Sequence, residues 1–235
     1  MNPIKKALFT LNLNPDKYSD ITAITYPLIK HYAKKIGAEF VEIKERRFPE
    51  WPPTFEKLQV YQLAQEMKND WNIFLDADAM VHPDCMDFTA HLNKDTVAHN
   101  GSDHASFRFR YDRFYMRDGR NIGSASWLCI ASDWCIELFE PPTDITPEDV
   151  GRMIYPTASE LKAGVEPIRL VEDFIMGRNI AKYGLKFTTV KEMMVKFGLV
   201  DQSGQPIGHF FHIYAIPKDE KVTKMQQVLQ AWGLT

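Results

Sequence analysis

The first third of the chain alternates between strand-like and helix-like segments, and this alternation constrains the fold more than any other feature. The strand-like runs are Ala7–Leu13, Glu39–Ile43 and Trp71–Leu75. The segments between them carry apolar residues at helical spacing. Alternation of this kind predicts an α/β fold with a parallel sheet covered by helices on both faces. In such sheets, ligands bind beyond the carboxyl ends of the strands.

The two helices between these strands have recognisable boundaries. Apolar residues share one face from Ile29 to Ile36, and Gly37 ends that helix. Pro27 predicts either a kink or a helix that starts after it, because proline lacks the N–H that a helix interior needs. The second helix follows Pro52 and places the apolar residues of Val60–Met67 on one face.

The rest of the chain repeats both kinds of element. We expect Gly123–Ile130 to be a small-residue turn that enters a buried strand. We also expect a helix over Glu172–Tyr183, strands over Leu185–Val190 and His209–Tyr214, and an amphipathic helix from about Pro217. The segment from Pro141 to Glu166 is rich in proline, threonine and acidic residues. We interpret it as a lid or an insertion beside the ligand site.

The whole sequence has the composition of a globular protein with one sizeable domain. It has 235 residues, of which 45% are hydrophobic and 25% charged, and a net charge of −3. That charge excludes a general attraction to polyanions. Its cysteines lack metal-ligand spacing and lie in apolar runs, so we expect buried thiols. No segment reads as a signal peptide or membrane span, and we therefore expect a soluble, cytoplasmic protein.

The strongest functional signal is a strand that runs directly into two carboxylates. Asp76 and Asp78 follow Trp71–Leu75 and are separated by one residue, so in extended backbone their side chains point to the same side. Carboxylate oxygens are the ligands that Mg²⁺ and Mn²⁺ prefer, and these ions keep positions open for phosphate oxygens. The pattern predicts a divalent metal site.

The stretch Asn72–Pro83, with Lys57 on the helix before it, resembles the Asp-x-Asp region of GT-A glycosyltransferases. It is similar to the glycogenin-like group and to galactosyl- and xylosyltransferases of the mannan and xyloglucan type. The resemblance implies a Rossmann-like, mostly parallel central sheet flanked by helices. It also implies a nucleotide-sugar donor, with a UDP-sugar favoured, a glycan, protein or small-molecule acceptor, and Mn²⁺ or Mg²⁺. Residues 1–235 would form a single domain, with a donor half (1–100) and an acceptor half (101–235).

The same resemblance suggests roles for individual residues. Asp76 would approach the donor ribose and the metal, and Asp78 would bind the metal that bridges the diphosphate. Thr10 and Asn12, at the end of the first strand, would hold the base and ribose, and Lys57 would lie near the donor.

Glu172 and Asp173 open a predicted helix that Gly184 ends. Carboxylates at a helix N-terminus are stabilised by the helix dipole, so a structural explanation exists. The pair also resembles the Glu-Asp motif of many inverting GT-A enzymes, in which the aspartate is the general base. That role would fall to Asp173. The motif favours inversion of the sugar configuration, whereas the glycogenin-like resemblance favours retention, and both outcomes stay open.

Two histidines near the C-terminus are candidates for completing the metal site. Many GT-A enzymes use such a histidine, and a neutral imidazole supplies one nitrogen ligand. We choose His212, with His209 second. They are three residues apart, so on a strand they would face opposite sides and would not share a metal.

Two further segments complete the set of candidates. Asn121, Gly123 and Ser124 resemble the Asn-x-Gly-Ser segment that lines the sugar pocket in the same families, although a plain tight turn also explains them. The segment Arg108–Arg120 interleaves arginines with aromatic residues. It is either an ordinary amphipathic strand or a surface for an anionic partner, such as the donor diphosphate or a nucleic-acid acceptor.

Two rival functions share the Asp-x-Asp signal or the fold. Phosphatases of the haloacid-dehalogenase type also place Asp-x-Asp after a strand, but normally after the first one, with Thr or Val where this chain has Met80. A non-catalytic protein that binds sugar nucleotides or nucleic acid would be expected to lack the acceptor-side carboxylates, which are present here as Glu172 and Asp173.

Overall fold

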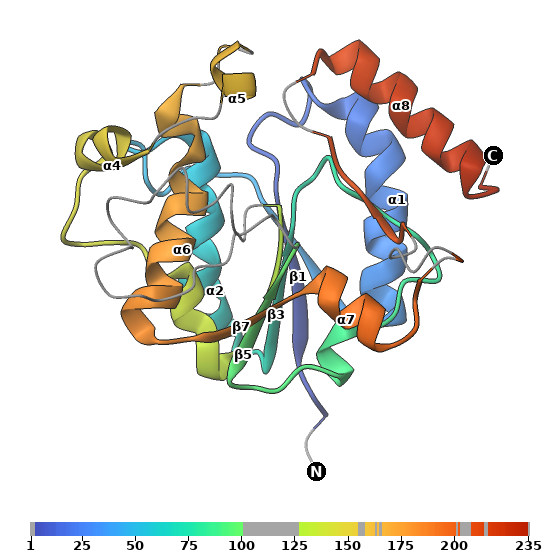
Figure 1. The fold of residues 1–235 in the computed structure, drawn as a ribbon, viewed down its shortest axis with the longest axis horizontal. Helices are drawn as coiled ribbons and strands as arrows, with labels where there is room; N and C mark the ends of the chain where they lie inside the picture. Colours follow the sequence, from blue (N-terminus) through green and yellow to red (C-terminus); the bar gives the residue numbers. More distant parts are fainter. Residues whose placement is uncertain are drawn as a thin grey trace.

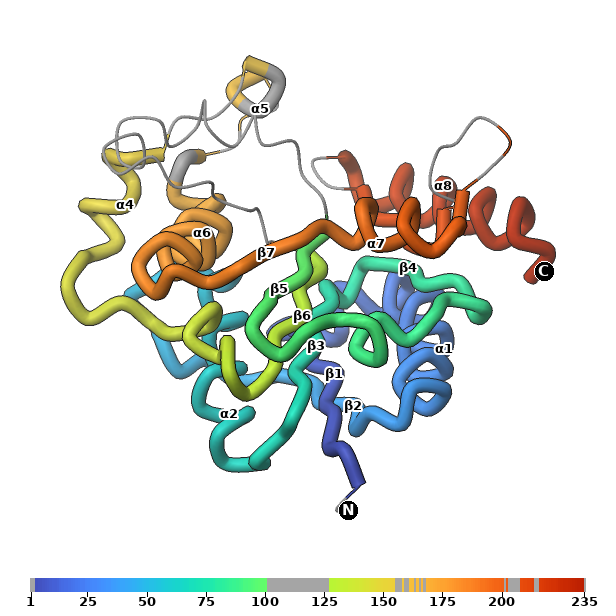
Figure 2. The backbone as a smooth tube through the Cα atoms, turned by 60° about the horizontal axis from the view of Figure 1, so that its bottom comes forward, coloured from blue at the N-terminus to red at the C-terminus, as the bar shows by residue number. Residues whose placement is uncertain are grey.

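The computed structural model describes residues 3–100, 127–154, 158–162, 164, 166–200, 202, 208–213 and 216–234. A central sheet separates two layers of helices (Figure 1). Helices α2 (Val60–Met67) and α6 (Val171–Tyr183) cover one face of the sheet. Helices α1 (Ser19–Lys35) and α7 (Val190–Lys196) cover the other, and Figure 2 shows the same division.

The central sheet has six strands in the order β2-β1-β3-β6-β5-β7. Their bounds are Lys6–Leu11 for β1, Ala38–Ile43 for β2, Trp71–Leu75 for β3, Thr96–His99 for β5, Leu128–Ser132 for β6 and Lys186–Thr189 for β7. Neighbours pair in parallel except at β6, which is antiparallel to both β3 and β5. The expected α/β fold with a mostly parallel sheet is confirmed.

Alternate residues of the central strands supply the two halves of the core. Ala7, Phe9 and Phe74 are buried against α2 and α6, while Leu8 and Ile73 are buried against α1 and α7. Successive side chains of a strand point to opposite faces, so an apolar strand fills both layers. Packing on both faces holds β1 and β3 in place, and with them the positions of their carboxyl ends.

Of the two outcomes that Pro27 left open, a kink or a later helix start, the later start is wrong, because α1 begins at Ser19 and contains Pro27. Residues on both sides of the proline are anchored. Ile21 is buried against Met80, and Ile29 is buried in the core beside the sheet. Burial of each such side chain contributes about 2 kcal/mol, which offsets the roughly 3 kcal/mol cost of an internal proline.

Several short elements were not predicted. Strand β4 (Met80–Val81) pairs with β8 (Phe210–Phe211) in a second, antiparallel sheet. Strand β8 is shorter than the expected strand His209–Tyr214. The segment interpreted as a lid or insertion contains helices α4 (Pro147–Met153) and α5 (Ala158–Lys162). The helix expected after Pro52 begins as the 3-10 helix Pro53–Gln59 and continues as α2. Further 3-10 helices among the described residues, which were not expected, are Phe88–Ala90, Asp133–Phe139 and Pro167–Leu170.

The chain ends in helix α8 (Lys218–Ala231), which lies beside α1 (Figures 1 and 2). Met225 of α8 is buried with Ile21 and Met80 in a small apolar cluster of its own. Within the described ranges, none of the helices combines the length and apolar character that crossing a bilayer requires. All three cysteines are buried and unpaired, as expected.

Candidate metal centre

The two aspartates lie on a turn that the fold holds from three directions. The Asp76 amide donates to the Trp127 carbonyl at 2.9 Å, and the Ala79 amide donates back to the Asp76 carbonyl at 3.0 Å. The Thr25 hydroxyl of α1 donates to the Ala77 carbonyl at 2.5 Å. The preceding strand β3 is buried along its whole length. The carboxylates are therefore presented at the edge of the sheet by a fixed backbone.

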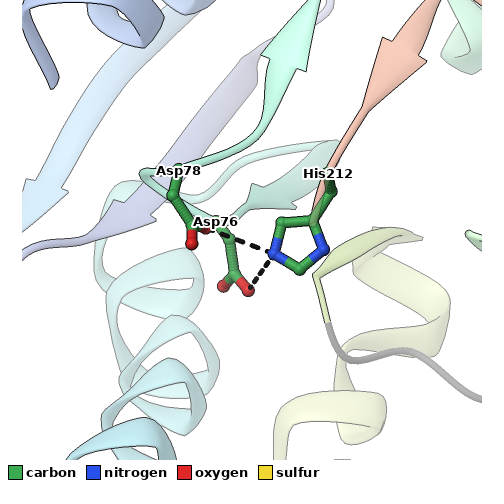
Figure 3. A group of neighbouring side chains, drawn as sticks. All are labelled: Asp76, Asp78 and His212. Carbon is green, nitrogen blue, oxygen red and sulfur yellow. Dashed lines mark ion pairs between the residues drawn. The ribbon is translucent and has the colours of Figure 1, made fainter. Parts of the chain in front are cut away.

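His212 reaches the aspartates from a distant part of the sequence. It follows β8, which the pairing with β4 holds beside the aspartate turn. The imidazole Nε2 lies 3.3 Å from Asp78 Oδ1 and 3.8 Å from Asp76 Oδ2 (Figure 3). The indole ring of Trp127 stacks on the imidazole, with 5.1 Å between the ring centroids. The side chain is thus aimed at the carboxylates and packed in that position.

One ligand atom from each of Asp76, Asp78 and His212 lies within 4.8 Å of the others. Two carboxylate oxygens and one imidazole nitrogen are a donor set that Mn²⁺ or Mg²⁺ accepts. The residues present therefore fit a divalent ion. His209 is not part of this group, since its ring stacks on His82 with 5.5 Å between the centroids.

Lys57 joins the aspartate turn to helix α6. Its Nζ lies 2.9 Å from Asp76 Oδ1 and 3.4 Å from Glu172 Oε1. The lysine side chain is only 5% exposed. Burial alone would lower the pKa of Lys57, but the negative charges of Asp76 and Glu172 outweigh it and raise the pKa above its ordinary value. The lysine is therefore a buried cation that links two predicted motifs.

A second lysine, Lys221 of α8, was not predicted. Its Nζ lies 2.5 Å from Asp78 Oδ2. Burial alone would raise the pKa of Asp78, yet the hydrogen bonds and charges of His212 and Lys221 hold the pKa well below its usual value. The only sequence signal for Lys221 is its position one helical turn before the buried Met225. That position identifies a packed residue but not what it touches.

Glu172 and Asp173 occupy the first turn of α6, where the sequence predicted them. Both are nearly buried, at 6% and 2% exposure. Burial raises the pKa of the Cys129 thiol, Lys57 opposes that rise, and the charges of Asp76 and Asp173 add to it. Asp173 therefore lies near enough to Cys129 of β6 for its charge to act on the thiol, as that of Asp76 does.

Thr10 and Asn12 lie at the end of β1, beside β3 in the sheet. The Asn12 amide nitrogen Nδ2 donates to Glu42 Oε1 at 3.1 Å, and the Tyr26 hydroxyl donates to the same oxygen at 2.6 Å. In the part of the chain that the structure describes, the buried Thr10 hydroxyl and Asn12 Oδ1 have no hydrogen-bond partner. Unpaired buried polar atoms are unusual and suggest a missing partner.

The remaining predicted residues lie outside the described residues. They are Asn121, Gly123, Ser124 and the whole segment Arg108–Arg120. Of the site residues that are described, Asp76, Asp78, His212, Lys57 and Glu172 form one connected group. Thr10 and Asn12 lie beside it on the neighbouring strand.

Neither a family model nor a curated protein sequence matches the chain. Among solved structures, it is similar to a glycosyltransferase involved in the glycosylation of the major capsid of PBCV-1, with a TM-score of 0.54 and 12% identity over 95% of this chain and 99% of that one. Lower scores are found for two further structures. One is a mutant of Drosophila β-1,4-galactosyltransferase 7 in complex with manganese, UDP-Gal and xylobiose (TM-score 0.46, 12% identity, 90% of this chain and 71% of that one). The other is mouse xyloside xylosyltransferase 1 (TM-score 0.44, 8% identity, 80% and 86%). This chain therefore has a GT-A-type fold, which it shares with the first of these glycosyltransferases over nearly the whole length of both chains.

Proposed function

We propose that the chain is a metal-dependent glycosyltransferase that moves a sugar from a nucleotide-sugar to an acceptor hydroxyl. The observation that carries the proposal is the group of Asp76, Asp78 and His212, whose ligand atoms lie within 4.8 Å of one another. It lies where strand β3 ends, in a fold shared with a glycosyltransferase. Ligands of open α/β sheets bind at such an edge.

Asp76, Asp78 and His212 would hold a Mn²⁺ or Mg²⁺ ion. Such an ion, when bound, neutralises charge on the leaving diphosphate. The chain's own contribution is to orient its ligands. Lys57 holds Asp76 Oδ1, so the opposite oxygen, Asp76 Oδ2, lies on the side of the His212 imidazole, as Asp78 Oδ1 does.

Asp173 is the residue we propose as the general base, which accepts the proton of the acceptor hydroxyl. Glu172 faces the buried ammonium of Lys57 at 3.4 Å, so we assign it a positioning role. Asp173 is buried beside Glu172 in the first turn of α6, and the likeness of this pair to the Glu-Asp motif supports the role. Under this proposal, residues 1–100 form the donor half and 101–235 the acceptor half.

The donor base would lie at the end of β1. Burial alone would raise the pKa of Glu42, but hydrogen bonds from Tyr26 and Lys44 hold it below its usual value, so its carboxylate only accepts hydrogen bonds. Asn12 must therefore turn its Nδ2 towards Glu42 and its Oδ1 away from it. That oxygen would accept from a base with a ring N–H, such as uracil or guanine, so a UDP-sugar, which the family resemblance favours, is compatible with this position.

The test is a panel of UDP-, GDP- and other nucleotide sugars with Mn²⁺, scored for donor binding and slow donor hydrolysis. We expect turnover of one donor by the wild type and at least a hundredfold loss in Asp78→Asn, since removing an electrostatic contact to the transition state costs on the order of 10²–10³ in rate. Asp84→Asn is the matched control, because this aspartate lies just beyond β4, outside the metal centre, and its side chain is 86% exposed. It should behave as the wild type.

Phosphatase activity without binding of any donor would contradict the proposal and favour the haloacid-dehalogenase alternative. In that alternative, Asp-x-Asp normally follows the first strand, whereas here it follows β3, the third strand in chain order. No described residue supports a nucleic-acid acceptor, because the arginine-rich segment that suggested it lies outside the described ranges.

A further inference from the structure

The last helix of the chain holds a lysine inside the metal centre. Met225 anchors α8 in the cluster with Ile21 and Met80. Lys221 lies one turn before Met225 on the same face of the helix and is 9% exposed. Its ammonium is therefore fixed by the packing of α8 and is not a mobile surface group.

The ammonium and a divalent ion would use the same carboxylate. Asp78 Oδ2 lies 2.5 Å from Lys221 Nζ, and Asp78 Oδ1 lies 3.3 Å from His212 Nε2. A carboxylate that already accepts a charge-assisted hydrogen bond attracts a second cation less strongly. Two cations on one carboxylate also repel each other, and this repulsion is stronger at a site shielded from water.

We propose that Lys221 is a resident cation of the metal centre, which competes with the divalent ion for Asp78 and thereby makes metal binding depend on the donor diphosphate. The inference rests on the proposed function. Without nucleotide, the ammonium neutralises Asp78 and weakens metal binding. With nucleotide, the diphosphate offers the ammonium a second anion and reduces its repulsion of the metal. By linkage, the metal then strengthens nucleotide binding by the same factor.

The test is calorimetric titration of MnCl₂ into the full chain, with and without saturating UDP. In Lys221→Met, which keeps the length of the side chain and removes its charge, Mn²⁺ alone should bind about tenfold more tightly, equivalent to ~1.4 kcal/mol. UDP should then increase Mn²⁺ affinity by a smaller factor than in the wild type. Lys221→Arg keeps the charge and should retain the wild-type pattern.

Lys224→Met is the matched control on the same helix. The Lys224 ammonium pairs with Glu220 at 3.0 Å on the surface, so its loss should leave Mn²⁺ binding unchanged. Thermal denaturation of each variant establishes that it is folded.

The outcomes separate this inference from the function on which it rests. If Lys221→Met binds Mn²⁺ no more tightly than the wild type, the competition is refuted, and an unchanged effect of UDP refutes the dependence on diphosphate. If no protein binds Mn²⁺ under either condition, the proposed metal-dependent function is itself contradicted, and the inference falls with it.

Discussion

Replacing Lys57 by methionine is expected to destabilise the fold, because it leaves two carboxylates without their shared cation. The side chain of Lys57 is 5% exposed and that of Glu172 is 8% exposed, so water does not replace the lost contact at Glu172. Breaking a buried ion pair costs about 3–5 kcal/mol. Asp76 is 21% exposed and retains some hydration, which places the cost near the lower limit, at ~3 kcal/mol.

This cost translates into a measurable shift of the melting temperature. For a chain of 235 residues, each kcal/mol lowers the midpoint by about 2–4 °C, so Lys57→Met should melt roughly 6–12 °C below the wild type. Differential scanning calorimetry at neutral pH measures the shift. Lys224→Met, which removes only a surface pair, should change the midpoint by less than about 2 °C.

A double variant identifies the source of the cost. Lys57→Met combined with Glu172→Gln removes the charge that the single variant leaves uncompensated, so it should recover at least half of the lost stability. A single variant that melts with the wild type would refute the account of Lys57. A double variant that melts with the single one would show that the Glu172 charge is not responsible.

The remaining predictions concern local features of the fold. Gly184 ends α6 with φ of 62°, and no atom lies within 4 Å of the position that a Cβ would take there, so Gly184→Ala should cost about 1 kcal/mol in urea unfolding through backbone strain alone. Gly151 lies inside α4 and has no positive φ, so Gly151→Ala should instead stabilise the protein by about 0.5–1 kcal/mol. If the two substitutions changed the free energy of unfolding in the same direction, both explanations would be contradicted. Phe74→Ala, at a position with 0% exposure, should cost about 3–5 kcal/mol, and a loss below ~1 kcal/mol would contradict its place in the core. Burial and the neighbouring His82 lower the pKa of His209 from its usual 6.5. As the pH falls towards 6.5 and below, His209 therefore takes up a proton more readily in the unfolded chain than in the folded one, and the stability of the fold decreases. Melting curves between pH 8 and 5 should show a smaller decline for His209→Gln, and an identical decline would rule out His209 as its source.

The sequence predicted the elements that are long or that end in a clear signal. Strand β3 has the predicted bounds Trp71–Leu75, because a strongly apolar run is ended by a carboxylate. Helix α6 begins one residue before the prediction, at Val171, and Gly184 ends it as expected. Strands β4 and β5 were missed because two or four residues are too few to show a periodicity. The start of α1 was missed because its tertiary contacts outweigh the effect of Pro27.

The candidate site was predictable only in part, for a related reason. Asp76 and Asp78 are separated by only one residue in the sequence, so the turn that follows β3 presents both. His212 was selected through a resemblance, and its approach depends on the pairing of β8 with β4. Lys221 depends on where α8 docks against α1. No local pattern encodes such a docking, so this contact could only be found in the folded chain.

The position of a bound metal ion tests the proposed metal centre most directly. A crystal of the full chain soaked in MnCl₂ and UDP, measured at a wavelength where manganese scatters anomalously, would locate the ion. We expect one strong anomalous peak roughly 2–2.5 Å from Asp76 Oδ2, Asp78 Oδ1 and His212 Nε2, and no peak in Asp78→Asn. A wild-type crystal with no peak between these three side chains, or with a peak bound elsewhere, would contradict the proposed metal centre.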